Sequence, residues 1–202
     1  MEQVFLWTIL GFLAGSIPFS ILVGRIFLKT DIRLYGDGNP GGTNAWKAGG
    51  WRIGLLVSIL DISKGFFPVM LAIRAGVSEW GLIPVGLSPI LGHAFSPFLK
   101  FRGGKALGAT GGVWIALIGF KALVIYALLT LPVLALQVEH AVAANAGMIS
   151  LLGYAVLIDQ SPFLITFGIL NTLAVAWKHR KELRCPIHLR PWMVNLLGRD
   201  SA

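Results

Sequence analysis

Charged side chains are scarce in this sequence. They make up 13% of its 202 residues, whereas hydrophobic side chains make up 55%, and the mean hydropathy is +0.75. Soluble domains carry roughly 25% charged residues, so the composition argues against a water-soluble globular domain. Because the apolar residues occur in long runs, the sequence predicts an all-α integral membrane protein.

Acidic residues and cysteine are also few. The 9 Asp and Glu residues face 17 Lys and Arg residues, which gives a net charge of +8. Nucleic-acid-binding proteins gather such cations on a polar chain, and because this chain is apolar almost throughout, no nucleic-acid partner is expected. A single cysteine, Cys185, excludes an intrachain disulfide framework and a multi-cysteine zinc site. We expect no metal and no cofactor, because the histidines lack the i, i+4 pairing and the acidic company of a metal site.

Long apolar segments predict about seven transmembrane helices, since each span needs about 20 mostly apolar residues. Only Lys121 separates the fourth segment from the fifth, so hydropathy alone leaves five or six spans open. The whole chain, 1–202, is expected to form a single membrane-embedded domain. The expected spans lie near residues 4–26, 53–73, 80–99, 106–120, 122–138, 141–158 and 161–177.

The cations predict how these spans are oriented. With about seven spans, nearly all of the 17 Lys and Arg residues fall on one side of the membrane. The opposite side holds only Arg74 and Lys121, and Lys64 lies within a span. Because cytoplasmic loops collect Lys and Arg, we expect the N-terminus outside and the C-terminus in the cytoplasm.

The first cytoplasmic loop is rich in glycine. It reads GDGNPGGTN over residues 36–44, and Lys47 follows. Its glycines allow backbone conformations with positive φ, in which successive N–H groups converge on an anion such as phosphate. The alternative is a plain flexible turn, since turns are rich in Gly, Asn and Asp. The candidate phosphate-binding residues here are Gly38, Asn39, Gly41, Thr43, Asn44 and Lys47.

The second cytoplasmic loop carries Arg102, Gly103, Gly104 and Lys105 just before an expected helix. Free N–H groups and the dipole at a helix start favour an anion, so these residues are candidates for a second phosphate site. The Gly-x4-Gly-Lys-Ser/Thr pattern of nucleotide-binding loops is absent. The alternative is that the cations only set the topology, as cations at span ends commonly do.

Two ionisable residues, Asp61 and Lys64, lie within the second expected span. Their i, i+3 spacing puts them on one helix face, so we expect them to form a structural ion pair in the protein interior. A functional alternative is that Lys64 orients an anionic substrate, or that the pair belongs to a small transporter of phosphorylated anions.

No histidine has an Asp at the His-x4-Asp spacing, and no Gly-x-Ser-x-Gly motif occurs. The loops are therefore expected to bind phosphate rather than to form a covalent intermediate.

Taken together, these motifs resemble those of the bacterial acyl-phosphate:glycerol-3-phosphate acyltransferases. The resemblance runs in order over residues 11 to 182. It is carried by GSIP at 15–18, Asp31 and Arg33, the loop 36–44, residues 61–65, residues 92–105, and WKHR at 177–180.

The resemblance implies a seven-span enzyme of the bacterial inner membrane, with its active site open to the cytoplasm. Such enzymes move a fatty acyl group from acyl phosphate, not from acyl-CoA or acyl carrier protein, to the sn-1 hydroxyl of glycerol 3-phosphate. The products are lysophosphatidic acid and phosphate. The implied partners are acyl phosphate, glycerol 3-phosphate and membrane lipid, and a monomer is expected.

The resemblance also implies roles for individual residues. Residues 38–44 would cradle phosphate, and Lys47 would bind the charge of glycerol 3-phosphate. Lys105, with Arg102 and the Gly103-Gly104 amides, would hold the acyl phosphate and stabilise the developing charge. His179 and Arg180 would act from the last span, and His179 would form hydrogen bonds rather than serve as a base.

Three departures from the family pattern stand out. Asp37 occupies a position where the family usually has Ser. A carboxylate there repels phosphate unless a cation lies between them. Alternatively, Asp37 accepts the glycerol hydroxyl proton as a catalytic base. Lys47 stands in place of Arg and loses the bidentate fork. Residues 181–186 break the pattern after His179 and Arg180. These departures raise the alternative of a paralogue with an altered acceptor or with lost activity.

Overall fold

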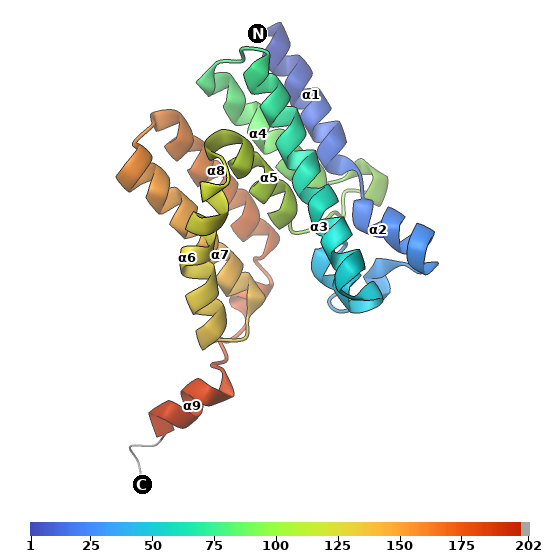
Figure 1. Ribbon diagram of the computed structural model, residues 1–202, viewed down its shortest axis with the longest axis vertical. Coiled ribbons are helices and arrows are strands. Elements are labelled where there is room, and N and C mark those ends of the chain that lie inside the picture. The colour runs from blue at the N-terminus through green and yellow to red at the C-terminus, as the bar shows by residue number, and fades with distance from the viewer. Residues whose placement is uncertain (199–202) are drawn as a thin grey trace. The chain divides into compact units, whose positions relative to one another are not determined.

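The computed structural model describes residues 1–198, and the regular structure within them is helical, without a β-strand (Figure 1). Its α-helices are α1 (Glu2–Ser16), α2 (Phe19–Val23), α3 (Gly42–Arg74), α4 (Glu79–Ala94), α5 (Leu107–Ile118), α6 (Lys121–Leu136), α7 (His140–Tyr154), α8 (Pro162–Lys178) and α9 (Pro191–Leu197). Short π-helical or 3-10 turns extend or connect them: η1 (Gly24–Leu28), η2 (Ile32–Leu34), η3 (Pro97–Leu99), η4 (Ala155–Asp159) and η5 (Glu182–Arg184).

The first apolar segment is broken near its middle. α1 ends at Ser16, Ile17 is extended, and α2 begins after Pro18. Proline has no N–H to donate and its ring clashes with the preceding helical turn, so the α-helix stops there and restarts. The Ile17 carbonyl accepts a hydrogen bond from the Phe19 N–H (3.0 Å) and another from the Lys64 ammonium (2.9 Å). The sequence predicts one span near 4–26, and the structure divides it into two helical pieces.

The long helix α3 also consists of two pieces. Gly50 has a φ of 74° and kinks the helix, because only glycine adopts this conformation without strain. The piece after the kink corresponds to the span expected near 53–73. The piece before it, 42–49, begins directly after the first glycine-rich loop, so that loop is held at a helix N-terminus.

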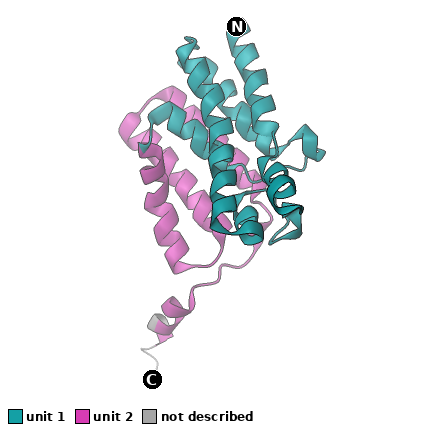
Figure 2. Cartoon of the chain, turned by 45° about the vertical axis from the view of Figure 1, so that its right-hand side comes forward, with its two compact units in different colours: residues 1–120 teal, residues 121–202 magenta. Residues whose placement is uncertain are grey.

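The chain divides into two compact units, residues 1–120 and 121–202 (Figure 2). In the first unit, α1 packs against α3 and α4, and α3 packs against α5. In the second unit, α6, α7 and α8 pack in sequence order. α5 ends at Ile118 and α6 begins at Lys121, so two helices lie where the sequence predicts two short spans.

Four helical segments within the described residues are long and apolar enough to cross a membrane: Glu2–Leu28, Gly42–Arg74, Glu79–Leu99 and His140–Asp159. The helices Leu107–Ile118, Lys121–Leu136 and Pro162–Lys178 are apolar but shorter. A helix rises about 1.5 Å per residue, and so α5 is shorter than the hydrocarbon layer of about 30 Å.

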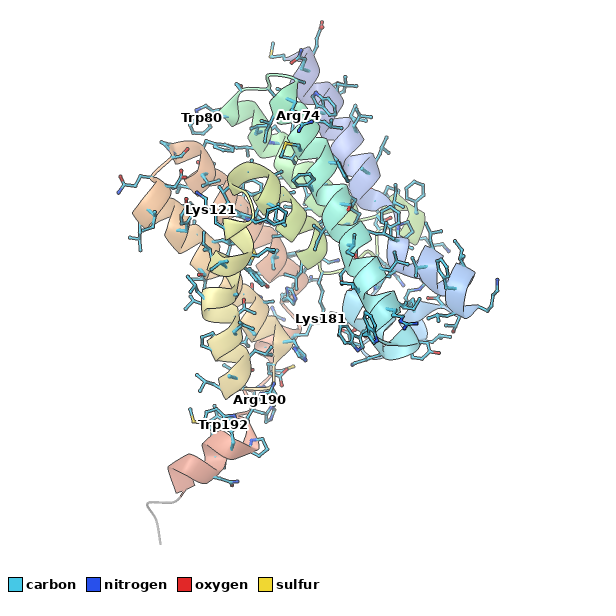
Figure 3. All side chains as sticks on the ribbon, in the orientation of Figure 1. Arg74, Trp80, Lys121, Lys181, Arg190 and Trp192 are labelled. Atoms are coloured by element: carbon cyan, nitrogen blue, oxygen red, sulfur yellow. The ribbon has the colours of Figure 1, made fainter. Side chains whose placement is uncertain are left out.

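Side chains at the ends of the units fit a membrane setting. Arg74 and Trp80 lie at the end of the first unit that also holds the N-terminus (Figure 3). In the second unit, Arg190 and Trp192 lie near the start of α9 (Figure 3), and each donates a hydrogen bond to a carbonyl at the end of α6. Trp and Arg are common at membrane–water boundaries, where an apolar body meets a polar tip.

Glycines bring α3 and α5 into backbone contact. A Cβ atom on Gly112 of α5 would overlap the Ile62 carbonyl, and one on Gly65 of α3 would overlap the Ala109 carbonyl. Neighbouring Gly111 has open space around its Cβ position. Close approach through small residues is the usual basis of helix association in lipid.

We therefore expect Gly112→Ala to destabilise the protein by about 1–3 kcal/mol, since α5 must move away from α3. Gly111→Ala is the matched control and should be neutral or stabilising by up to about 1 kcal/mol, because alanine favours the helix. Thermal unfolding of both purified variants in the same detergent measures the difference. Equal unfolding temperatures would show that α3 and α5 are not this close.

Candidate active site

The first glycine-rich loop connects η2 to the start of α3. Gly36 and Gly38 have φ angles of 59° and 73°, so two glycines of this loop adopt the positive φ that the sequence suggests for all of them. A side chain at Gly36 would overlap Asn44 Oδ1 and would lie 3.1 Å from Lys47 Nζ. Asn44 and Lys47 therefore lie against the loop from the first turns of α3.

Asp37 accepts hydrogen bonds from both sides of its loop. Its Oδ1 atom accepts from the Asn39 N–H (3.1 Å) and from Asn44 Nδ2 (2.7 Å). Its Oδ2 atom accepts from Lys105 Nζ at 2.8 Å, in an ion pair. This pair joins the first glycine-rich loop to the second, 68 residues further along the chain.

The Asp37 carboxylate is ionised near neutral pH. Burial raises its pKa, but the hydrogen bonds from Lys105, the Asn39 N–H and Asn44, together with the Lys105 charge, outweigh burial and lower the pKa from 3.8 to about 2. A carboxylate with so low a pKa is a poor proton acceptor near neutral pH. The geometry thus favours the interpretation in which a cation offsets the carboxylate over the one in which Asp37 is a catalytic base.

The second glycine-rich loop is fixed by His93 at the end of α4. The Gly104 N–H donates to the His93 carbonyl (3.0 Å). A side chain at Gly103 would overlap the same carbonyl, and one at Gly104 would overlap the His93 ring and lie 3.1 Å from the Pro40 carbonyl. Both glycines are therefore required by space, and they bring Lys105 to the first loop.

Asp61 and Lys64 form the ion pair that their spacing predicts. Lys64 Nζ lies 2.7 Å from Asp61 Oδ1, and both side chains are almost completely buried. Lys64 also donates to the Ile17 carbonyl at the break between α1 and α2 (2.9 Å). The His93 Nδ1 atom lies 3.7 Å from the same Asp61 oxygen, so the buried pair contacts the residue that holds the second loop.

A small polar cavity in the first unit lies beside these groups. Asp61, Lys64 and His93 line it together with Ser16, Ser96 and Gly104. The Ser96 hydroxyl donates to the Ser16 carbonyl (2.6 Å) and ties the end of α4 to the end of α1. Sequence reasoning does not identify the two serines or the His93–Asp61 contact. The GSIP motif at 15–18 and the GHAFSP motif at 92–97 are the signals that point to them.

The remaining candidates of the first unit lie in two places. Thr43 is exposed in the first turn of α3, Gly41 is its N-cap, and Lys47 is exposed one turn later, so these belong to the first loop. Arg102 is close to Lys105 in sequence, but it lines a different pocket, with Arg25, Arg33 and Lys100. Within residues 1–198, no group of three or more His, Cys, Asp and Glu side chains comes together as a metal site would need.

His179 and Arg180 belong to the second unit, at the end of α8. His179 is 2% exposed, and its Nδ1 atom lies 3.0 Å from the Val175 carbonyl. Because a carbonyl can only accept, Nδ1 carries the hydrogen. The exposed Arg180 guanidinium stacks on the Trp177 ring at 4.6 Å and donates to the Trp177 carbonyl.

Breaking the buried Asp61–Lys64 pair should be costly. We expect Asp61→Leu or Lys64→Met alone to lower the free energy of unfolding by about 3–5 kcal/mol, because each leaves one buried charge without its partner. The double variant Asp61→Leu/Lys64→Met removes both charges and should be clearly more stable than either single variant. Unfolding of the three proteins in detergent tests this expectation, and additive losses in the double variant would contradict it.

The fold and the loops define the class of protein: an all-helical integral membrane protein in which two glycine-rich loops present cations and amide groups suited to phosphate. The model of the glycerol-3-phosphate acyltransferase family matches residues 5–187 of the chain. This protein therefore belongs to the glycerol-3-phosphate acyltransferase family.

Relatives and solved structures agree with this assignment. Glycerol-3-phosphate acyltransferase 2 of Bacillus anthracis is 38% identical over 176 residues, which cover 87% of this chain and 91% of the relative. Glycerol-3-phosphate acyltransferase 1 of Thermotoga maritima is 36% identical over 199 residues, covering 91% and 97%. The glycerol 3-phosphate form of PlsY (YgiH), an integral membrane glycerol 3-phosphate acyltransferase, is similar in structure, with a TM-score of 0.81 and 28% identity, and the match covers 89% of this chain and 90% of PlsY. Its lysophosphatidic acid form has a TM-score of 0.77.

Proposed function

We propose that this protein transfers a fatty acyl group from acyl phosphate to the sn-1 hydroxyl of glycerol 3-phosphate. The observation that carries the proposal is the Asp37–Lys105 ion pair, which joins the two glycine-rich loops in a chain of the glycerol-3-phosphate acyltransferase family. Both substrates carry phosphate, and the joined loops offer cations, side-chain amides and backbone N–H groups to such anions.

The reaction needs little activation of the donor. The glycerol hydroxyl oxygen attacks the carbonyl carbon of acyl phosphate, the new ester bond forms, and the bond from that carbon to the phosphate oxygen breaks. The hydroxyl proton passes to a phosphate oxygen, so the products are 1-acylglycerol 3-phosphate and inorganic phosphate. Asp37 is too weak a base for this proton, with its pKa of about 2. Positioning and charge neutralisation are then the main tasks of the protein.

Lys105 is the central residue in this proposal. Its ammonium is held by Asp37 at the meeting point of the two loops, where it can neutralise a departing phosphate and the developing carbonyl charge. Lys47, Asn39 and Asn44 offer donors to the glycerol 3-phosphate from the first loop. The amides of Gly103 and Gly104 are assigned to the acyl phosphate, whereas the Arg102 side chain lines a different pocket. His179 and Arg180 keep the hydrogen-bonding roles that the family resemblance implies.

The Asp61–Lys64 pair is assigned a structural role rather than a transport role. Lys64 is bonded to Asp61 and to the Ile17 carbonyl, so its charge is already used in holding α3 to the break between α1 and α2. This arrangement gives no support to an anion transporter.

We propose that the apolar segments, which number about seven, all cross the bacterial inner membrane and form one acyltransferase domain. We also propose that the protein acts as a monomer. The N-terminus lies outside, and the C-terminus and the glycine-rich loops lie in the cytoplasm. The first loop leads into the start of α3, at the opposite end of that helix from Arg74 (Figure 3). This separation agrees with the gathering of cations in the cytoplasmic loops.

An assay with palmitoyl phosphate and glycerol 3-phosphate tests the function directly. The purified protein should form lysophosphatidic acid, and Lys105→Ala should lower kcat by a factor of about 10² to 10³, since it removes a charge-stabilising group. Lys29→Ala removes a cation that lies outside the two glycine-rich loops, and this variant should retain full activity. Absence of product from the unaltered protein would overturn the proposal, and full activity of Lys105→Ala would place the phosphate site elsewhere.

Asp37→Ser distinguishes a positioning role of Asp37 from that of a base. We expect this variant to keep kcat within about tenfold of the unaltered protein, because a substrate phosphate oxygen takes the proton and a general base would contribute about 10²–10⁴-fold. The pH profile of kcat should also be unchanged. A loss of several hundredfold, with a shifted pH profile, would show that Asp37 is the catalytic base.

A further inference from the structure

A second pocket in the first unit combines cations with apolar side chains. Its volume is about 400 Å³, and four cationic residues line it: Arg25, Arg33, Lys100 and Arg102. Leu22 and Phe98 line it as well and are 41% and 63% exposed. A free inorganic phosphate would satisfy the cations but would leave these apolar side chains in water. A ligand with both a negative headgroup and a hydrocarbon part matches the whole pocket.

The cations of this pocket come from separate segments. Arg25 is in η1, Arg33 is in η2, and Lys100 and Arg102 follow η3. Cations that only set the topology can point anywhere at the membrane surface, whereas these converge on one cavity. Lys100 has a backbone φ of 52°, which is uncommon for a residue other than glycine.

Positive charge is in excess in the pocket. Asp31 pairs with Arg33 (2.6 Å) and more weakly with Arg25 (3.9 Å), so one carboxylate is shared by two guanidinium groups. In the part of the chain that the structure describes, Lys100 and Arg102 have no carboxylate partner. The pocket therefore presents an uncompensated positive charge to an anion.

The pocket also lies near the end of an apolar helical segment. Leu22 and Arg25 are near the end of Glu2–Leu28, a segment long and apolar enough to cross a membrane. Basic pockets at the cytoplasmic ends of membrane helices attract anionic headgroups. At such a helix end, a bilayer lipid can place its phosphate among the cations and its chains against Leu22 and Phe98.

We infer that this pocket binds the headgroup of an anionic phospholipid of the surrounding bilayer. Pro18 and Leu99 line both this pocket and the polar cavity that holds Asp61 and His93. A bound lipid therefore contacts the turn that leads into Gly103, Gly104 and Lys105. The binding itself does not depend on the acyl transfer proposed above.

Two matched double variants test the inference. Arg25→Gln/Lys100→Gln removes two cations of the pocket, whereas Lys29→Gln/Arg52→Gln removes two exposed cations outside it. Lys29 has a φ of 55°, close to the 52° of Lys100, so the two lysines match in backbone conformation and the two pairs match in charge. Each full-length protein is placed in nanodiscs of phosphatidylcholine with increasing phosphatidylglycerol, and the lipid that it retains is measured by native mass spectrometry.

We expect the unaltered protein and the control pair to retain phosphatidylglycerol in preference to phosphatidylcholine. Removing a cation near a lipid headgroup weakens binding about fivefold, so the variant Arg25→Gln/Lys100→Gln should lose about 25-fold in affinity. Lys100→Gln alone should lose about fivefold and serves if the double variant does not purify. Equal retention by all variants would overturn the inference.

Two further measurements identify the source of the anion. Inorganic phosphate should not displace the retained lipid, and displacement would show a site for free phosphate instead. In the acyltransferase assay at fixed lipid composition, the variant Arg25→Gln/Lys100→Gln should have the same KM for palmitoyl phosphate as the unaltered protein. A raised KM for the donor with unchanged lipid retention would show that the pocket holds the donor and would also overturn the inference.

Discussion

A single buried ammonium group connects the segments on which the site is built. Lys64 lies 2.7 Å from Asp61 on the same helix and donates to the Ile17 carbonyl, where the first apolar segment is broken. A charge at this depth is stable only when it is paired and hydrogen-bonded, and Lys64 has both kinds of partner. Beside it, His93 contacts Asp61 and holds Gly104 through its carbonyl. The position of the second glycine-rich loop thus depends on a polar contact inside the apolar part of the protein.

The cations of the first unit perform different tasks according to their partners. Lys64 is neutralised inside the protein, and Lys105 is held by a half-exposed carboxylate between two loops. Lys100 and Arg102 line an open pocket with apolar walls. The net charge of +8 is therefore divided among structural, site-forming and surface functions, and membrane topology accounts for only part of it.

Hydropathy and local spacing predict much of this structure. Helices lie where apolar segments occur, and the i, i+3 spacing of Asp61 and Lys64 predicts their ion pair, because these signals are local in the chain. The Asp37–Lys105 contact is not predictable in this way, since it joins residues 68 positions apart. The same holds for the separation of Arg102, which lines another pocket, from Lys105, which pairs with Asp37. The expectation of positive φ does not extend to Gly41 and Gly42. Space and helix capping, rather than positive φ, account for glycine at these two positions.

The ion pair between the loops has a consequence for how substrates enter. The Asp37 and Lys105 side chains are 52% and 24% exposed, and an ion pair this accessible contributes at most about 1 kcal/mol. A contact of that strength is broken in roughly one molecule in six at any moment. An incoming phosphate therefore has only to compete with one carboxylate for the Lys105 ammonium.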